Sequence, residues 1–303
     1  MKKVLLTGAS GFIGLHCLEA LLERSYSIHA VSARERGNSY REQVEWHHAD
    51  LHNAEHVLRL IASVKPDYLL HLAWDVTHGI YWRSLENLRW VKTSLNLLQA
   101  FIDGGGKRAL LVGSCAEYDW NYGYCTENLT PVQPETLYGV CKDALHRVAT
   151  AAAAEKGVSL SWARLFFLFG PGEHGDRLIP AVINSLLQGE EALCTHGEQI
   201  RDYIYVKDAA AALAALLESQ VEGPVNIASG RPVVLKDLIA EAAETTGRPD
   251  LVRLGAIAVE PDDQQLLLAN TRRLNEEVDW QPRYNLKQGL METVEWWRRK
   301  TAK

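Results

Sequence analysis

The 303-residue sequence predicts an α/β fold, in which a doubly wound parallel sheet is followed by a smaller C-terminal lobe. Three observations predict it. Short apolar runs alternate with segments of helical periodicity through the first half of the chain. A glycine-rich turn joins the first run to the first helix. Beyond residue 170, glycine and proline cluster and the expected elements become shorter. Repeated strand–helix units imply parallel strands with right-handed crossovers and helices on both faces.

The elements of the first lobe follow from local patterns. Strands are expected at 4–7, 27–32, 44–48, 68–72, 108–114 and 159–166, and helices at 13–24, 53–64, 84–103 and 134–156. Leucines on one face support the first helix. The run Gly104-Gly105-Gly106 ends the third helix as a C-terminal cap, and Pro134 is placed near the start of the fourth.

The second half divides between two lobes. Helices at 178–188, 235–246 and 286–299 belong to the smaller lobe, whereas a helix at 206–218 and a strand at 224–228 return to the first. We therefore expect a dinucleotide-binding domain at 1–170, with 203–228 returning to it. Residues 171–202 and 229–303 form the smaller lobe, which closes over the first and binds substrate.

Composition excludes several classes of protein. Hydrophobic residues make up 47% of the chain and the net charge is −6, which argues against nucleic-acid and polybasic membrane partners. No apolar stretch reaches the roughly 20 residues of a membrane span. The five cysteines form no Cys-x-x-Cys pair, which is typical of reduced thiols in a cytoplasm. No histidine spacing indicates a metal, and His47-His48 is interpreted as a strand end, so no metal site is predicted.

The glycine-rich turn has the spacing Gly8-x-x-Gly11-x-x-Gly14 between a strand and a helix. The first glycine allows the tight turn, the second lets a pyrophosphate approach the backbone, and the third lets helix and strand pack closely. The helix N-terminus then offers free N–H groups to phosphates. A purely structural turn is the alternative, but the context favours a dinucleotide site.

The end of the second strand indicates which dinucleotide binds. An acidic residue there would hold the ribose 2′-hydroxyl of NAD(H), but the sequence continues through Ser32 to Arg34. Arg34 can pair with a 2′-phosphate, so NADP(H) is favoured and NAD(H) remains possible; a solvated loop arginine is the alternative. Asp50-Leu51 follows the third strand and is placed to contact the adenine, or is a surface aspartate.

Three residues predict the reacting centre. Tyr138 and Lys142 are one helical turn apart and leave the same face. A tyrosine has a pKa of about 10, and a nearby ammonium lowers it. Lys142 can also bond the nicotinamide ribose. Ser114 ends the fifth strand, where its hydroxyl can donate to a substrate carbonyl oxygen or merely cap a turn. The neighbouring Cys115 is interpreted as a small buried residue rather than a nucleophile.

Together these motifs resemble the extended short-chain dehydrogenase/reductase family, of the NAD-dependent epimerase/dehydratase type with a Rossmann sheet. The resemblance covers nearly the whole chain and includes the turn 7–14, residues 71–74, the stretch 164–172 and the stretch 201–208. It implies cofactor contacts from Thr7, Gly8, Ser10, Gly11, Phe12, Ile13, Gly14, Ser32, Arg34, Asp50, Leu51, Leu72, Ala73, Trp74, Tyr138 and Lys142. It also implies catalysis by Ser114, Tyr138 and Lys142, and substrate contacts from Ser114, Glu117, Tyr118, Arg177 and Arg201. A cytoplasmic homodimer acting on a nucleotide sugar, paired through helices 84–103 and 134–156, is expected from the same resemblance.

Departures from the family pattern narrow the reaction. The 4,6-dehydratases carry Asp-Glu after the hydroxyl residue, where this chain has Cys115 and Ala116, so dehydration is disfavoured. Phe167 stands where many members have an asparagine, which removes a usual diphosphate contact. The first hypothesis is NADPH-dependent reduction of a nucleotide-linked 4-keto-6-deoxy sugar. The second is a nucleotide-sugar epimerase with retained NAD(P), and the third is a catalytically silent NADP(H)-binding sensor.

Overall fold

The computed structural model describes residues 2–33, 42–259 and 263–301. Its large sheet has seven strands in the order β11-β7-β5-β4-β1-β2-β3, and each neighbouring pair is parallel. The strands are β1 (Lys3–Thr7), β2 (Ser27–Ser32), β3 (Val44–His48), β4 (Tyr68–His71), β5 (Arg108–Ser114), β7 (Ser159–Leu165) and β11 (Gly223–Ile227). The order reverses between β1 and β4, the position at which doubly wound sheets bind ligands.

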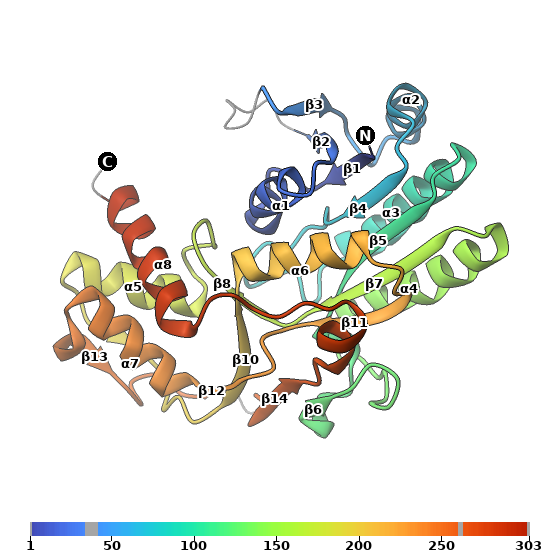
Figure 1. Cartoon of the computed structure of the whole chain (residues 1–303). Coiled ribbons are helices and arrows are strands. Elements are labelled where there is room, and N and C mark those ends of the chain that lie inside the picture. Colours follow the sequence, from blue (N-terminus) through green and yellow to red (C-terminus); the bar gives the residue numbers. More distant parts are fainter. Residues whose placement is uncertain (1, 34–41, 260–262, 302–303) are drawn as a thin grey trace.

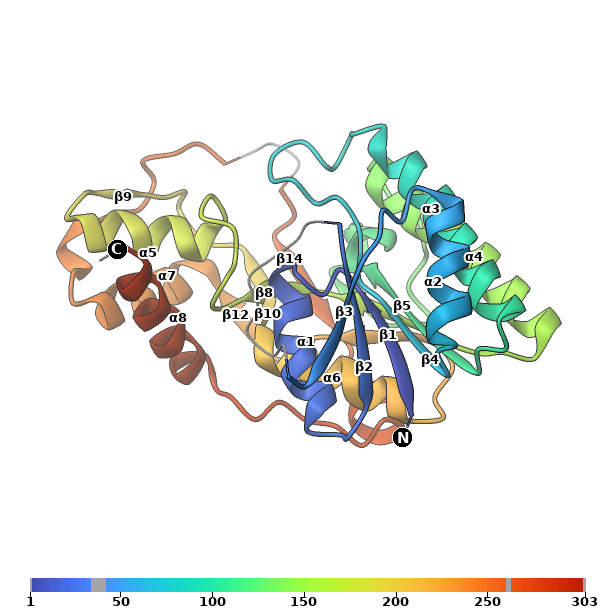
Figure 2. The ribbon, with the colours of Figure 1, turned by 90° about the horizontal axis from the view of Figure 1, so that it is seen from above.

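Helices cover both faces of this sheet (Figures 1 and 2). One face carries α1 (Phe12–Leu22) and α6 (Val206–Glu218), whose buried alanines and leucines form one apolar core with β1 and β2. The other face carries α2 (Ala54–Val64), α3 (Glu86–Asp103) and α4 (Leu137–Lys156), which form a second core. The predicted doubly wound α/β architecture is therefore confirmed.

The start of α4 differs from the prediction. The helix begins at Leu137, not at Pro134, because the Thr136 hydroxyl accepts the N–H of Gly139 at 3.1 Å and caps the first turn. Its last residue is followed by Gly157, which has φ +65° and ends the helix in the left-handed conformation. The cap fixes the rotation of the helix and so the direction in which its first side chains leave.

The smaller lobe lies beside the carboxyl end of the large sheet (Figure 2). Its helices are α5 (Leu178–Gln188), α7 (Leu235–Thr246) and α8 (Leu286–Thr301). A mixed sheet joins β12 (Pro232–Val234), β10 (Ile200–Tyr205), β14 (Leu266–Ala269) and β6 (Tyr124–Cys125), and β8 (Phe167–Phe169) also pairs with β10. The short strands β9 (Ala192–Leu193) and β13 (Val252–Arg253) form a separate pair. Helix α5 packs against α7 and α8 around one apolar core.

The chain crosses between the two lobes at β10 and α6, and a buried aspartate stabilises each crossing. Strand β10 belongs to the mixed sheet, and the chain then returns to the large sheet with α6, which begins at Val206. Asp202 accepts the N–H groups of Ser229 and Gly230, at 2.8 and 3.0 Å. Asp208 similarly accepts two N–H groups, from residues 283 and 284. These bonds hold the segments that connect the two lobes. The predicted domain boundaries, at residues 170, 203 and 228, stay a prediction.

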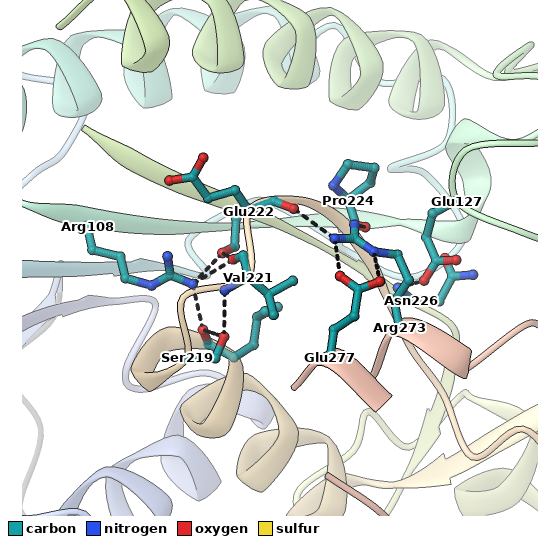
Figure 3. Close-up of polar contacts among 11 residues, drawn as sticks. Arg108, Glu127, Ser219, Val221, Glu222, Pro224, Asn226, Arg273 and Glu277 are labelled. Carbon is teal, nitrogen blue, oxygen red and sulfur yellow. Dashed lines mark hydrogen bonds and ion pairs between the residues drawn. The ribbon is translucent and has the colours of Figure 1, made fainter. Parts of the chain in front are cut away.

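Arg273 covers the outer edge of the large sheet (Figure 3). It begins the one-turn π-helix η4 (Arg273–Glu277), and its guanidinium donates to the carbonyl oxygens of Pro224 and, at 3.1 Å, Glu222. Glu277 pairs with it at 2.8 Å. Since β11 is the terminal strand on this side, η4 satisfies carbonyl groups that would otherwise face an unpaired edge.

Two further predictions concern composition. Within the described ranges, no helix combines the length and apolar character that a bilayer crossing needs. All five cysteines are buried, and none forms a disulfide bond. Burial raises the pKa of the Cys115 thiol. Cys115 is thus the small buried residue that the sequence predicted.

Candidate functional site

The glycine turn after β1 is packed too tightly for side chains. Gly8 has φ +70°, and a Cβ there would lie 2.8 Å from the backbone nitrogen of Ala73. A Cβ on Gly14 would lie 2.1 Å from the carbonyl oxygen of Gly8. Gly11 donates its N–H to that oxygen at 3.0 Å and, having no side chain, leaves the amide groups at the N-terminus of α1 uncapped. The turn is a cradle for an anionic group, and it fits a dinucleotide pyrophosphate.

Thr7, at the end of β1, is fixed by a buried histidine. The Thr7 hydroxyl bonds Nδ1 of His71 at 2.7 Å, and Nε2 of the same ring bonds Ser94 at 2.8 Å. Burial lowers the pKa of His71 to about 3, so the ring is neutral. Thr7 also accepts the N–H groups of Leu72, at its carbonyl, and of Ala73, at its hydroxyl. The structure thus brings Thr7, Leu72 and Ala73 together beside the glycine turn.

The residues predicted around the adenosine lie on three loops. The Ser32 hydroxyl, at the end of β2, donates to that of Ser10 at 3.4 Å. Arg34 lies outside the described residues. Asp50 is exposed and its carboxylate accepts the N–H of His52 at 2.9 Å, whereas Leu51 is buried. Phe12 and Ile13 are partly buried and pack against the core of the smaller lobe, and Ile13 also packs against the core of the large sheet. Their cofactor contacts stay predictions.

The structure places Ser114, Tyr138 and Lys142 together. The Ser114 side chain lies beside the Tyr138 phenol and partly offsets the burial that raises its pKa. The Lys142 ammonium donates to the carbonyl oxygen of Val112 at 2.8 Å and lies 5.8 Å from the centre of the Tyr138 ring. Close packing fixes the approach of α4, because a Cβ on Gly139 would lie 2.2 Å from the Ala116 carbonyl oxygen. The three predicted groups therefore converge at the carboxyl end of β5.

Burial dominates the electrostatics of this centre. It raises the pKa of the Tyr138 phenol, which is only 8% exposed, and it lowers the pKa of Lys142 to about 7. The lysine was expected to lower the pKa of the tyrosine. In the structure the loss of hydration dominates, and the pKa of the tyrosine is raised. Tyr138 is thus a protonated donor at neutral pH.

An aromatic enclosure around Tyr138 was not anticipated from the sequence. Tyr81, Trp82 and Trp74 contact the Tyr138 ring edge to face, with ring centres 5.0, 5.7 and 6.3 Å away. The indole N–H of Trp74 donates to the buried amide of Asn87 at 2.8 Å, which fixes that ring. The aromatic residues that follow β4 closely in the sequence could have predicted this enclosure.

Glu117 and Tyr118, which were predicted to contact the substrate, are bonded to other residues of the protein. The Glu117 side chain is fully buried, pairs with Arg164 at 2.7 Å and accepts the Ser114 N–H at 2.8 Å. The Tyr118 hydroxyl donates to Asn226 at 2.7 Å, and its side chain is 1% exposed. Glu117 thereby holds the backbone of Ser114, and Tyr118 ties this segment to β11. Their contacts with a substrate stay predictions. The partners of both lie far away in the sequence, which hid this role.

The predicted substrate arginines lie on the side of the smaller lobe. Arg177 lies 5.5 Å over the ring of Tyr81, and its charge partly offsets the burial that raises the pKa of Glu173 to about 8. Arg201 is 6% exposed and donates to Asp263 at 2.6 Å. The guanidinium of Arg201 also lies 5.7 Å over Phe167, the residue that departs from the family pattern. The roles of Arg177 and Arg201 toward a substrate stay predictions.

Comparison with known proteins places this sequence and fold among enzymes that act on nucleotide sugars. The family model described as "NAD dependent epimerase/dehydratase family" matches residues 4–228. The CDP-abequose synthase of Salmonella typhimurium is 28% identical and aligns with 96% of this chain and 97% of its own length. Among solved structures, the UDP-glucose 4-epimerase of Thermotoga maritima with UDP-glucose is 25% identical, with a TM-score of 0.88 over 99% of this chain and 100% of that one. MoeE5 in complex with UDP-glucuronic acid and NAD is 26% identical, with a TM-score of 0.82 over 98% and 99%.

Proposed function

Since this chain belongs to the NAD dependent epimerase/dehydratase family, we propose that it catalyses the NADPH-dependent reduction of a nucleotide-linked 4-keto-6-deoxy sugar to the 6-deoxyhexose. The coarser assignment, an NAD(P)-dependent enzyme that modifies nucleotide sugars, follows from the family and its relatives. The observation that carries the proposal is the convergence of Ser114, Tyr138 and Lys142 at the carboxyl end of β5. Lys142 also contacts Trp74, which directly follows the Ala73 that packs on Gly8.

Each of these side chains has a distinct part. The bound nicotinamide supplies a hydride for C4 of the sugar. Tyr138, protonated at neutral pH, gives its proton to the C4 oxygen as charge develops there. Ser114 donates a hydrogen bond to the same oxygen. Lys142 bonds the nicotinamide ribose and lowers the energy of the phenolate that remains, a role that depends on the occupied site.

The choice of reduction rests on two local features. No carboxylic acid follows Ser114 directly, because Cys115 and Ala116 occupy those places, and Glu117 is paired with Arg164. The carboxyl groups that would act as acid and base in the elimination of water are therefore missing from these positions. The end of β2 at Ser32 carries no carboxylate that would repel a 2′-phosphate, which supports NADP(H), although MoeE5 binds NAD. An epimerase with retained NAD(P) is the second candidate, favoured by the likeness to the UDP-glucose 4-epimerase.

A homodimer is part of the proposal. The helices α3 and α4 pack against each other and leave apolar side chains on the surface. Leu88 on α3 is 54% exposed, and Val140 and Val148 on α4 are 47% and 51% exposed. Such a face supports pairing with a second copy through these helices, and light scattering gives the molar mass that checks it.

The decisive experiment is a panel of CDP-, dTDP- and UDP-linked 4-keto-6-deoxyhexoses with NADPH and with NADH. A reductase consumes NADPH in proportion to product, whereas an epimerase shows no net change in reduced cofactor. The Tyr138→Phe variant loses turnover by about 10²–10⁴-fold and still binds the cofactor. Tyr122→Phe, which alters an exposed ring, is the matched control. Faster reaction with NADH would contradict the assignment to NADP(H), and undiminished turnover in Tyr138→Phe would contradict the mechanism.

A further inference from the structure

Three side chains with metal-binding atoms meet on the outer strands of the large sheet, away from the reacting centre. In the parallel pairing of β2 with β3, His29 lies opposite Glu45, and His47 lies two residues further along β3. Side chains two residues apart leave the same face of a strand. The three side chains therefore share one face, and their ligand atoms all lie within 4.8 Å of one another.

The spacing of the donor atoms suits a small transition-metal ion. Nδ1 of His29 is 3.0 Å from Nε2 of His47, and the Glu45 carboxylate oxygens lie 3.4 and 3.5 Å from these two nitrogens. Zinc binds histidine nitrogen and carboxylate oxygen at about 2.0–2.2 Å in tetrahedral geometry, which separates neighbouring donor atoms by roughly 3.3 Å. Each histidine nitrogen thus has a Glu45 oxygen near that distance, Oε2 for His29 and Oε1 for His47. A small rotation of the carboxylate would bring one oxygen within reach of an ion held by both rings.

The surroundings leave the site both anchored and accessible. His29 is 6% exposed and fixed in the sheet, whereas the Glu45 side chain is 66% exposed and faces solvent. Without a metal ion, one imidazole donates an N–H to the other, and the rings are inclined by only 26°. A rotation of the His47 ring, which is less buried, turns both nitrogen lone pairs to a common point. Solvent at the Glu45 side then supplies the fourth ligand.

We propose that His29, Glu45 and His47 bind a divalent transition-metal ion of the zinc type at the β2–β3 edge. The ion would link β3, the terminal strand of the sheet, to β2 through side chains as well as through backbone hydrogen bonds. The binding energy would then add to the stability of this edge. No metal was predicted from the sequence, because the ligands are neighbours only once the two strands pair.

The test uses the full chain without an affinity tag, stripped with a chelator and titrated with Zn²⁺ in a calorimeter and with Co²⁺ by visible absorption. We expect one ion per chain, the intense Co²⁺ bands of a four-coordinate site, and a higher melting temperature with the ion. Glu45→Gln and His47→Gln lower the affinity by more than about tenfold. Both positions are accessible enough for the variants to fold, which circular dichroism verifies.

The matched control is His48→Gln, which removes the adjacent histidine on the opposite face of β3. It binds the ion as the unchanged chain does. The proposal is overturned if the unchanged chain binds no stoichiometric ion, or if His47→Gln and His48→Gln bind equally well. The first outcome would leave His29 and His47 as a hydrogen-bonded pair, and the second would place the ion elsewhere.

Discussion

The Lys142 ammonium lies 3.7 Å from the centre of the Trp74 indole ring and also donates to the Val112 carbonyl oxygen at 2.8 Å. A cation in contact with an indole face is stabilised by the ring quadrupole. Burial nevertheless lowers the pKa of this lysine to about 7, so its charge remains costly in the folded chain. The proposed catalytic residue is therefore a source of instability that a ligand would relieve.

Lys142→Met tests this conclusion. Below pH 7 the folded protein bears the full cost of the charged lysine, and the cost disappears as the pH rises from about 7 toward the unfolded value of 10.5. We expect the Met variant to be inactive and to melt at a higher temperature at pH 7, by about 2–4 °C for each kcal/mol gained. Its advantage shrinks by pH 10. Lys92→Met, at an exposed site on α3, changes neither quantity; a less stable Lys142→Met at pH 7 contradicts the argument.

Glu117→Gln separates positioning from substrate contact. The change leaves the buried Arg164 guanidinium without its carboxylate, which costs about 3–5 kcal/mol. Urea denaturation measures this loss. The Michaelis constant of the folded fraction stays within about twofold, because the side chain is fully buried. Glu155→Gln, exposed on α4, serves as the control. A large rise in Michaelis constant without loss of stability would instead support Glu117 as a substrate contact.

Glu173 gives the proposed substrate site a pH dependence. Burial raises the pKa of its carboxyl to about 8, against the opposing charge of Arg177. Above that pH the new carboxylate would compete with a substrate diphosphate for the arginine. Steady-state kinetics should show the Michaelis constant for the nucleotide sugar rising above about pH 8, and Glu173→Gln should remove that rise. Asp176→Asn, exposed nearby, keeps it. A rise of equal size in both variants would assign the titration to another group.

His146 makes the folded chain sensitive to acid. Its ring stacks on Trp162 with centres 4.8 Å apart, and burial lowers its pKa from 6.5 to about 4. The unfolded chain binds the proton first, so the contribution of His146 to stability is present above pH 6.5 and is lost as the pH falls through 4. His146→Phe should lose less stability between pH 7 and 5 than the unchanged chain, as measured by thermal melts. The exposed His196→Gln should not differ from the unchanged chain, and an equal loss in His146→Phe would exclude this histidine as a cause.

Much of the fold could be predicted because its signals are local. The glycine spacing at 8, 11 and 14 and the alternating apolar segments required no knowledge of distant partners, and the structure reproduces the strands and helices within a few residues. The start of α4 was misplaced because a threonine cap at 136 competes with a proline two residues earlier. Which sheet β10 joins could not be predicted, because it depends on pairing with β8, β12 and β14.

The contacts within the candidate site were harder to predict from the sequence than the fold. Convergence of Ser114 with Tyr138 and Lys142 followed from their positions on a strand end and one helix face. The partner of Glu117 is 47 residues away, and His29 meets His47 only through strand register. Local spacing carries no information about such pairs. It also could not anticipate that burial controls the pKa of Tyr138, since burial depends on aromatic rings from another loop.

The contact of Arg273 with the last strand of the large sheet has a consequence for truncated chains. A protein that stops after α7 keeps every strand of that sheet but loses the segment that hides the carbonyl groups of Glu222 and Pro224. Those groups would then be free to pair with a strand of another molecule. Shortened forms of this enzyme should accordingly aggregate during expression, even though they contain every strand of the large sheet.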